Sequence, residues 1–161
     1  MLRSKFLSLG LVVWFSVSSM AFAQDNLEAV SQKFMSVAET ALSNGAFEDA
    51  QVNFERALVA DPANIQAMVG LGKAHEAAGR VGKGLRLYRM ALEADPNHIT
   101  ALAAQSLAFL KVSEPVRASA NLALLERLCV KGCSELAEVR DAIKSFNDLA
   151  LAAPTSEAAA P

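Results

Sequence analysis

The sequence predicts an all-α fold of short helix hairpins stacked side by side into a right-handed curved array. Hydrophobic residues make up 53% of the 161 residues but aromatic residues only 6%, which is typical of closely packed, Ala-rich helices. The segment Ala-Leu-Val-Ala-Asp-Pro at 57–62 returns as Ala-Leu-Glu-Ala-Asp-Pro at 91–96, so the chain repeats itself after thirty-four positions. A period of this length indicates a repeated helix–turn–helix unit, and such units stack into solenoids.

The overall charge argues against one class of function. The chain has 15 Lys and Arg residues against 17 Asp and Glu residues, so it has no general excess of positive charge. Nucleic-acid-binding proteins usually carry a basic face. The length suits one domain.

The segment at 1–23 is expected to be a secretory signal. Arg3 and Lys5 precede an uncharged stretch at 6–23 that ends in Ala-Phe-Ala, the small–x–small pattern that signal peptidase accepts. We therefore expect cleavage after Ala23, export, and a periplasmic location. The alternative is an uncleaved anchor helix, although the densest apolar part, 9–17, is short for a membrane span of about 20 residues.

The chain after the cleavage point is expected to form one helical domain at 24–150. Without Arg3 and Lys5 it keeps 13 basic and 17 acidic residues, a formal charge of −4. Apolar periodicity and turn residues predict seven helices, at about 27–44, 47–60, 63–78, 81–94, 97–111, 114–128 and 135–150.

The repeated positions have residue types that suit paired helices. Gly45 and Gly79 occupy the point where each first helix must end, because Gly adopts the left-handed conformation at least cost. Phe54 and Tyr88 supply bulk between the helices. A Pro follows an Asp at the end of each unit, as at Pro62. Because Pro is disfavoured inside a helix but suits a first turn, it is expected to end one helix and start the next.

These repeats resemble the tetratricopeptide repeat family over residues 31–98. The resemblance implies units at about 31–64 and 65–98, with a degenerate third unit at 99–132. The matching residues are Gly45, Ala50, Phe54, Ala57 and Pro62 in the first unit, and Leu71, Gly72, Gly79, Tyr88, Ala91 and Pro96 in the second.

The third unit keeps its apolar positions but loses its final Pro. The next step of the period selects Leu102, Ser106, Phe109, Ala118, Leu122 and Leu125. Apolar residues then recur at three- and four-residue steps over 135–150, which predicts an amphipathic helix that covers the open end of the stack, with Ser134 as its cap. The tail at 151–161 has little to bury and is expected to be mobile.

The two cysteines, Cys129 and Cys133, follow the third unit. In an oxidising compartment we expect them to form a disulfide that fixes the corner before the end helix, with Gly132 supplying the bend. A redox-active pair is the alternative, although such pairs usually have two intervening residues rather than three.

Basic residues gather near one helix, at Arg80, Lys83, Arg86 and Arg89. Acidic residues, among them Glu48, Asp49 and Glu55, occupy the equivalent helix one repeat earlier. We interpret both groups as solvated faces that partly compensate one another, and a docking patch for an acidic partner as the alternative.

The family resemblance implies that ligands bind in a concave groove lined by the first helix of each unit. The residues expected to line it are Gln32, Met35, Glu39, Leu42, Gln66, Val69, Lys73, Glu76, Ala103, Leu107 and Leu110.

The predicted function is that of a non-catalytic adaptor or scaffold, which binds a protein or peptide partner during assembly or maturation of the cell envelope. No sequence motif for catalysis, metal binding or a cofactor is present. A thiol–disulfide carrier using the two cysteines and a homo-oligomeric structural element remain as alternatives.

Overall fold

The computed structural model describes residues 9–152, and within this range it contains seven α-helices and no strand. The helices are α1 (Leu9–Ser43), α2 (Phe47–Ala60), α3 (Ile65–Ala77), α4 (Val81–Ala94), α5 (Ile99–Lys111), α6 (Pro115–Leu128) and α7 (Ser134–Ala152). Residues 1–8 of the expected signal segment and 153–161 of the expected tail lie outside the described range. The all-α fold class is confirmed.

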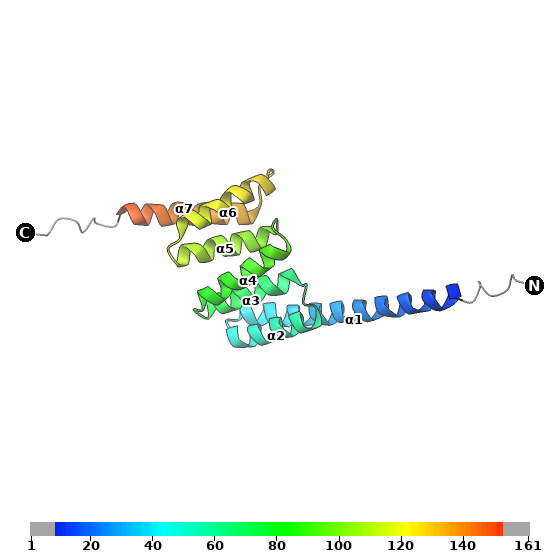
Figure 1. Cartoon of the computed structure of the whole chain (residues 1–161). Coiled ribbons are helices and arrows are strands. Elements are labelled where there is room, and N and C mark those ends of the chain that lie inside the picture. Colours follow the sequence, from blue (N-terminus) through cyan, green and yellow to red (C-terminus); the bar gives the residue numbers. More distant parts are fainter. Residues whose placement is uncertain (1–8, 153–161) are drawn as a thin grey trace, which may run out of the picture.

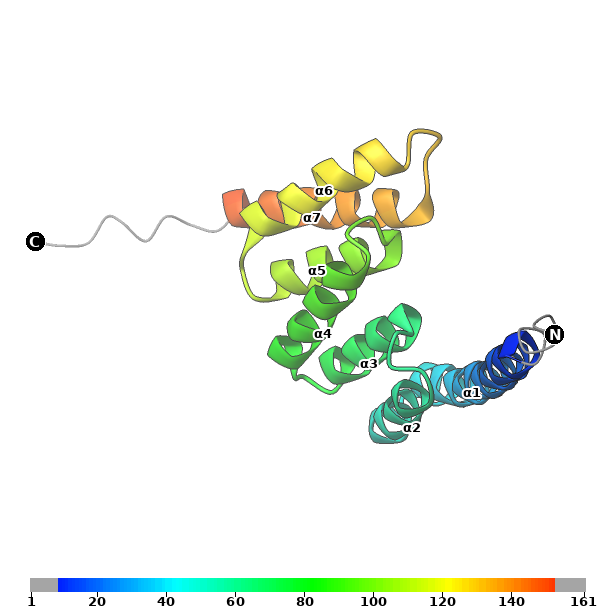
Figure 2. The ribbon, with the colours of Figure 1, turned by 45° about the vertical axis from the view of Figure 1, so that its right-hand side comes forward.

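The helices form three hairpins and an end helix (Figure 1). The hairpins are α1–α2, α3–α4 and α5–α6, and each stacks on the next through α2 against α3 and α4 against α5. The first helices also contact one another, α1 with α3 and α3 with α5, so they share one side of the stack. Helix α7 packs against α5 and α6, as expected for a helix that covers the end (Figure 2).

The first helix differs most from expectation. It extends back to Leu9, the first described residue, whereas a start near residue 27 was expected, and no Gly or Pro interrupts the helix from Leu11 to its end at Ser43. The cleavage expected after Ala23 would therefore fall inside α1, and it stays a prediction. Among the described residues, no helix combines the length and the apolar composition that a membrane crossing requires.

Glycines that face aromatic rings let neighbouring helices approach closely, between α2 and α3 and between α3 and α4. Phe54 and Tyr88 are almost fully buried. A Cβ atom on Gly70 would overlap the ring of Phe54, and one on Gly72 would overlap the ring of Tyr88. A Cβ on Gly84 would lie 2.9 Å from the carbonyl oxygen of Gly72, so α3 and α4 approach at backbone distance.

The turn inside each hairpin uses one residue in the left-handed conformation. Gly45 has φ 76° and Gly79 has φ 78°, as expected. Ser113, at the same position of the third repeat, has φ 60°. At all three turns the next residue's N–H bonds back into the helix, as Glu114 N does to Phe109 O at 2.8 Å. The third turn therefore keeps the geometry without the Gly that favours it.

The helices α3 and α5 begin later than expected because a side chain caps each one. The side-chain oxygen of Asn64 accepts from Ala67 N at 2.9 Å, so α3 starts at Ile65. The Nδ1 of His98 accepts from Ala101 N at 3.2 Å, so α5 starts at Ile99. Pro62 and its repeat partner therefore lie in the turn before the cap, not in the first helical turn.

The expected cap of α7 was wrong, whereas its bounds differ from the approximate ones by only one or two residues. Ser134 is the first residue of the helix rather than its cap, and its Oγ donates to Glu135 Oε2 at 2.9 Å. The helix continues to Ala152, beyond the expected end at 150.

Candidate functional site

Two adjoining hollows lie along the side of the stack that the first helices share. The first has a volume of about 120 Å³ and lies between α1 and α3 near the start of α5. Its lining residues are Glu39, Leu42, Phe54, Gln66, Val69, Gly70, Lys73 and Thr100.

The second hollow has a volume of about 160 Å³ and lies between α3 and α5. Its lining residues are Lys73, Glu76, Ala77, Tyr88, Ala104, Leu107 and Lys111. Lys73 lines both hollows, so they adjoin at this residue, and we call the two together the groove.

The groove has an apolar floor and polar walls. Val69 and the ring of Phe54 are buried beneath the first hollow. Gly70 lies against that ring and has no side chain that could cover it. Gln66 and Lys73 are exposed above this floor. Apolar pockets with a few convergent polar groups are typical of peptide- and ligand-binding surfaces.

A charge network crosses the second hollow. Glu76 accepts a hydrogen bond from the Tyr88 hydroxyl at 2.7 Å, and Lys111 Nζ lies 2.7 Å from its other carboxylate oxygen. The Glu76 side chain is only 11% exposed. Burial, with the nearby Glu76 carboxylate as the second cause, raises the pKa of Tyr88 far above its usual value. Glu76 is therefore bound to its neighbours, while Lys73 stays accessible.

Seven of the eleven residues expected in the groove line these hollows: Glu39, Leu42, Gln66, Val69, Lys73, Glu76 and Leu107. Gln32 is exposed on α1 but outside both hollows. Met35 is 5% exposed and packs in the core with α2 and α3, so its expected place in the groove is corrected. Whether these residues bind a partner stays a prediction.

The expected face of α5 was wrong by part of a turn. Ala103 is 3% exposed, and Leu110 packs on the core cluster that holds Leu136 and Val139 of α7. The end helix therefore covers that face of α5. On α5, Ala104 lines the groove in place of its neighbour Ala103.

Sequence reasoning missed seven lining residues: Phe54, Gly70, Ala77, Tyr88, Thr100, Ala104 and Lys111. The repeat could have found Thr100, because it stands one full period after Gln66, which was expected in the groove. Ala104 and Lys111 stand one period after Gly70 and Ala77, which were missed themselves.

The four basic residues do not all face water as expected. Arg80 is half-buried: its Nη2 donates to Gln51 Oε1 at 2.6 Å and its Nε to His75 Nδ1 at 3.2 Å. Burial, then the charges of Arg80 and Lys83, lower the pKa of His75. Arg89 is exposed, and its Nε lies 3.8 Å from Glu93 of its own helix rather than pairing with the acidic residues of α2.

The cysteines lie side by side at the α6–α7 corner. Cys129 and Cys133 are paired, with Cα atoms 5.7 Å apart, and Gly132 between them has φ 83°. Within the described range, no group of three His, Cys, Asp or Glu side chains is placed to hold a metal ion.

Comparisons with known proteins agree with this architecture. The family model for the tetratricopeptide repeat matches residues 38–99. Superkiller protein 3 of Saccharomyces cerevisiae is 29% identical over 82 residues, which are 51% of this chain but only 6% of that protein. The chain therefore spans a small part of this curated relative.

Solved tetratricopeptide structures share the fold at low sequence identity. The TPR2B domain of yeast Sti1, in a complex with pHsp70, has a TM-score of 0.69 and 13% identity over 75% of this chain and 98% of that one. The Yersinia enterocolitica type III secretion chaperone SycD, bound to a peptide of the translocator YopD, has a TM-score of 0.62 and 21% identity over 73% and 89%. The matched repeats, the hairpin stack and the Gly–aromatic packing agree: residues 38–99 are tetratricopeptide repeats, and the described stack shares the fold of solved tetratricopeptide domains.

Proposed function

We propose that this protein is a non-catalytic adaptor that binds a segment of a partner protein in the groove. The observation that carries the proposal is the pair of hollows that adjoin at Lys73, with buried apolar groups below and exposed polar groups at their walls. Related folds provide support, because yeast Sti1 and the SycD chaperone were solved with pHsp70 and a YopD peptide respectively. Binding would bury apolar partner side chains on a preformed surface.

We place this activity in the cell envelope, where the partner would be a protein undergoing assembly or maturation. The support is the amino-terminal pattern of Arg3 and Lys5, an uncharged apolar stretch and Ala-Phe-Ala before residue 24. Sizing the chain recovered from the periplasm by mass spectrometry tests the location. The mass of a chain that begins at Gln24 supports export with cleavage. Recovery of the intact chain from the cytosol contradicts export.

Affinity capture from envelope extract tests the groove. The three baits are the wild-type mature chain, a Gln66→Ala, Lys73→Glu double variant, and Lys33→Glu as a control with the same charge change outside the groove. We expect the wild type and the control to retain a common partner and the double variant to lose it. Retention by all three baits would contradict groove binding. Glu76 is left unchanged because it binds Tyr88 and Lys111.

The cysteine pair is assigned a structural role in this proposal. Cys129 is 7% exposed and Cys133 is half-buried, so an attacking thiolate has poor access to either sulfur. A structural cross-link predicts a reduction potential below about −300 mV. A bond that a glutathione buffer reduces readily would favour the thiol–disulfide carrier instead.

A further inference from the structure

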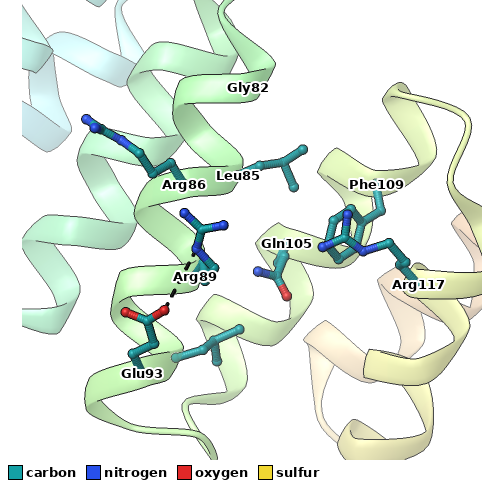
Figure 3. A pocket seen from close by; sticks show the side chains of 9 residues that line it. Gly82, Leu85, Arg86, Arg89, Glu93, Gln105, Phe109 and Arg117 are labelled. Carbon is teal, nitrogen blue, oxygen red and sulfur yellow. Dashed lines mark ion pairs between the residues drawn. The ribbon is translucent and has the colours of Figure 1, made fainter.

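A second cleft opens between α4, α5 and α6, and it has a volume of about 480 Å³ (Figure 3). Gln105 and Phe109 of α5 line it, whereas Ala104 and Lys111 of α5 line the groove. At about 100° per residue these two pairs point to different sides of the helix, roughly 130° apart. The cleft is therefore separate from the groove.

Three arginines surround the cleft. Arg86 and Arg89 come from α4 and Arg117 from α6, against one lining carboxylate, Glu93. Arg89 pairs with Glu93 only at 3.8 Å, with both side chains about two-thirds exposed, and such pairs are weak. The Arg117 guanidinium lies 4.1 Å from the centre of the Phe109 ring (Figure 3). Its Nη1 also lies 2.7 Å from Glu114 Oε2 of its own hairpin, with the two side chains 60% and 42% exposed, so a ligand carboxylate would share or replace this exposed pair.

A buried amide adds a hydrogen-bond donor to the cleft. Gln105 is only 8% exposed, and its Oε1 accepts from Asn121 Nδ2 at 2.9 Å, which orients the amide. Its nitrogen then points toward α4, as Figure 3 shows, and it donates to no described residue, so it is open to solvent in the cleft. A donor held in this way matches a ligand acceptor.

The preceding repeat shows that the open cleft is not a general feature of this fold. Arg80 stands one period before Glu114, and its side chain crosses to Gln51 and His75 and fills the equivalent position. One period after Gln51 and His75 stand Leu85 and Phe109, whose apolar side chains cannot accept a hydrogen bond from an arginine. The cleft between α4 and α6 is therefore left for another occupant.

We propose that this cleft binds an acidic peptide segment of a partner protein, independently of the groove. A guanidinium group can bind a carboxylate through two parallel hydrogen bonds, in bidentate geometry. The three arginine side chains of the cleft line a space large enough for two or three partner side chains. Leu85 and Leu92 supply apolar contacts for side chains between the acidic ones. Nucleic-acid bases are disfavoured because Arg117 already covers the Phe109 ring.

NMR titration of the full mature chain tests this proposal. The probe is an acetylated, amidated hexapeptide of alternating Glu and Leu, and the control peptide has Gln in place of Glu. We expect the Gln105 side-chain amide and the arginine Nε–H signals of the cleft to shift saturably with the Glu peptide alone. Groove signals, such as those of Gln66, should not move.

Two variants make the result decisive. Arg86→Glu changes an exposed side chain and should weaken binding about tenfold or more, whereas Lys131→Glu, with the same charge change on an exposed loop, should alter it less than about twofold. Equal weakening by both variants would overturn the proposal. Equal shifts with inorganic phosphate, or with vesicles of anionic lipid at the same charge concentration, would replace the peptide with a general anion or a membrane surface.

Discussion

The hydroxyl of Tyr88 donates a 2.7 Å hydrogen bond to Glu76, which joins the two helices of the second hairpin beside the groove. Lys111 holds the other oxygen of the same carboxylate at 2.7 Å, so the network extends into the third hairpin. The groove wall is therefore stabilised by the same side chains that line it.

Tyr88→Phe should lower stability while keeping the fold. The ring stays in place, as Phe54 does in the first repeat, but the largely buried Glu76 carboxylate loses a donor. A hydrogen bond to a charged group contributes about 1.5–3 kcal/mol. Urea unfolding measures the change, and a midpoint equal to that of the wild type would contradict the importance of this bond.

Alkaline pH should destabilise the protein through Tyr88. Burial and Glu76 raise its folded pKa above the unfolded value of 10.0, so its contribution is present below pH 10 and is lost as the pH rises further. The chain has one Tyr, so absorbance at 295 nm reports this group alone. We expect phenolate to form only with unfolding. Titration near pH 10 in the folded state would contradict the buried network.

Gly72→Leu should unfold the domain, whereas Lys73→Glu should change stability by less than about 0.5 kcal/mol. Even a Cβ on Gly72 overlaps the Tyr88 ring, while the neighbouring Lys73 is exposed in the groove. Thermal melts of the two variants test these two faces of α3. Equal losses of stability would contradict the assigned faces.

Acid should weaken the protein through His75. Burial and Arg80 lower its folded pKa below 6.5, so the stabilisation is complete above pH 6.5 and falls as the pH drops toward the folded pKa. His75→Gln should lose less stability than the wild type between pH 7.5 and 5. The control is His98→Asn, which keeps a capping acceptor as at Asn64. Identical pH profiles for His75→Gln and the wild type would exclude this role.

Ser113→Gly should stabilise the third hairpin by about 0.5–1 kcal/mol, because Gly adopts a positive φ without the penalty that Ser carries. Gly82→Ser serves as a contrast, since Gly82 has open space and no positive φ. Denaturant midpoints compare them. A loss of stability in Ser113→Gly would show that the Ser side chain contributes more than its strain costs.

The sequence period was sufficient to predict α2 to α6 to within about two residues, but it did not predict the start of α1. It did not indicate that Ala103 and Leu110 of α5 are covered, since that depends on how α7 packs against them. It also could not separate Arg80 from its exposed neighbours, because the bonds of Arg80 reach residues on other helices. A contact that is specific to one pair of repeats does not recur along the chain, so the sequence period does not reveal it.

Site-specific photo-crosslinking in living cells tests the central claim, that the groove receives the partner, most directly. A photoreactive amino acid replaces Lys73, which lines both hollows, and in a second strain it replaces Lys33 on the exposed surface of α1. We expect a discrete adduct with one protein from position 73 and none from position 33. No adduct at 73, or the same adduct from both positions, would contradict the claim.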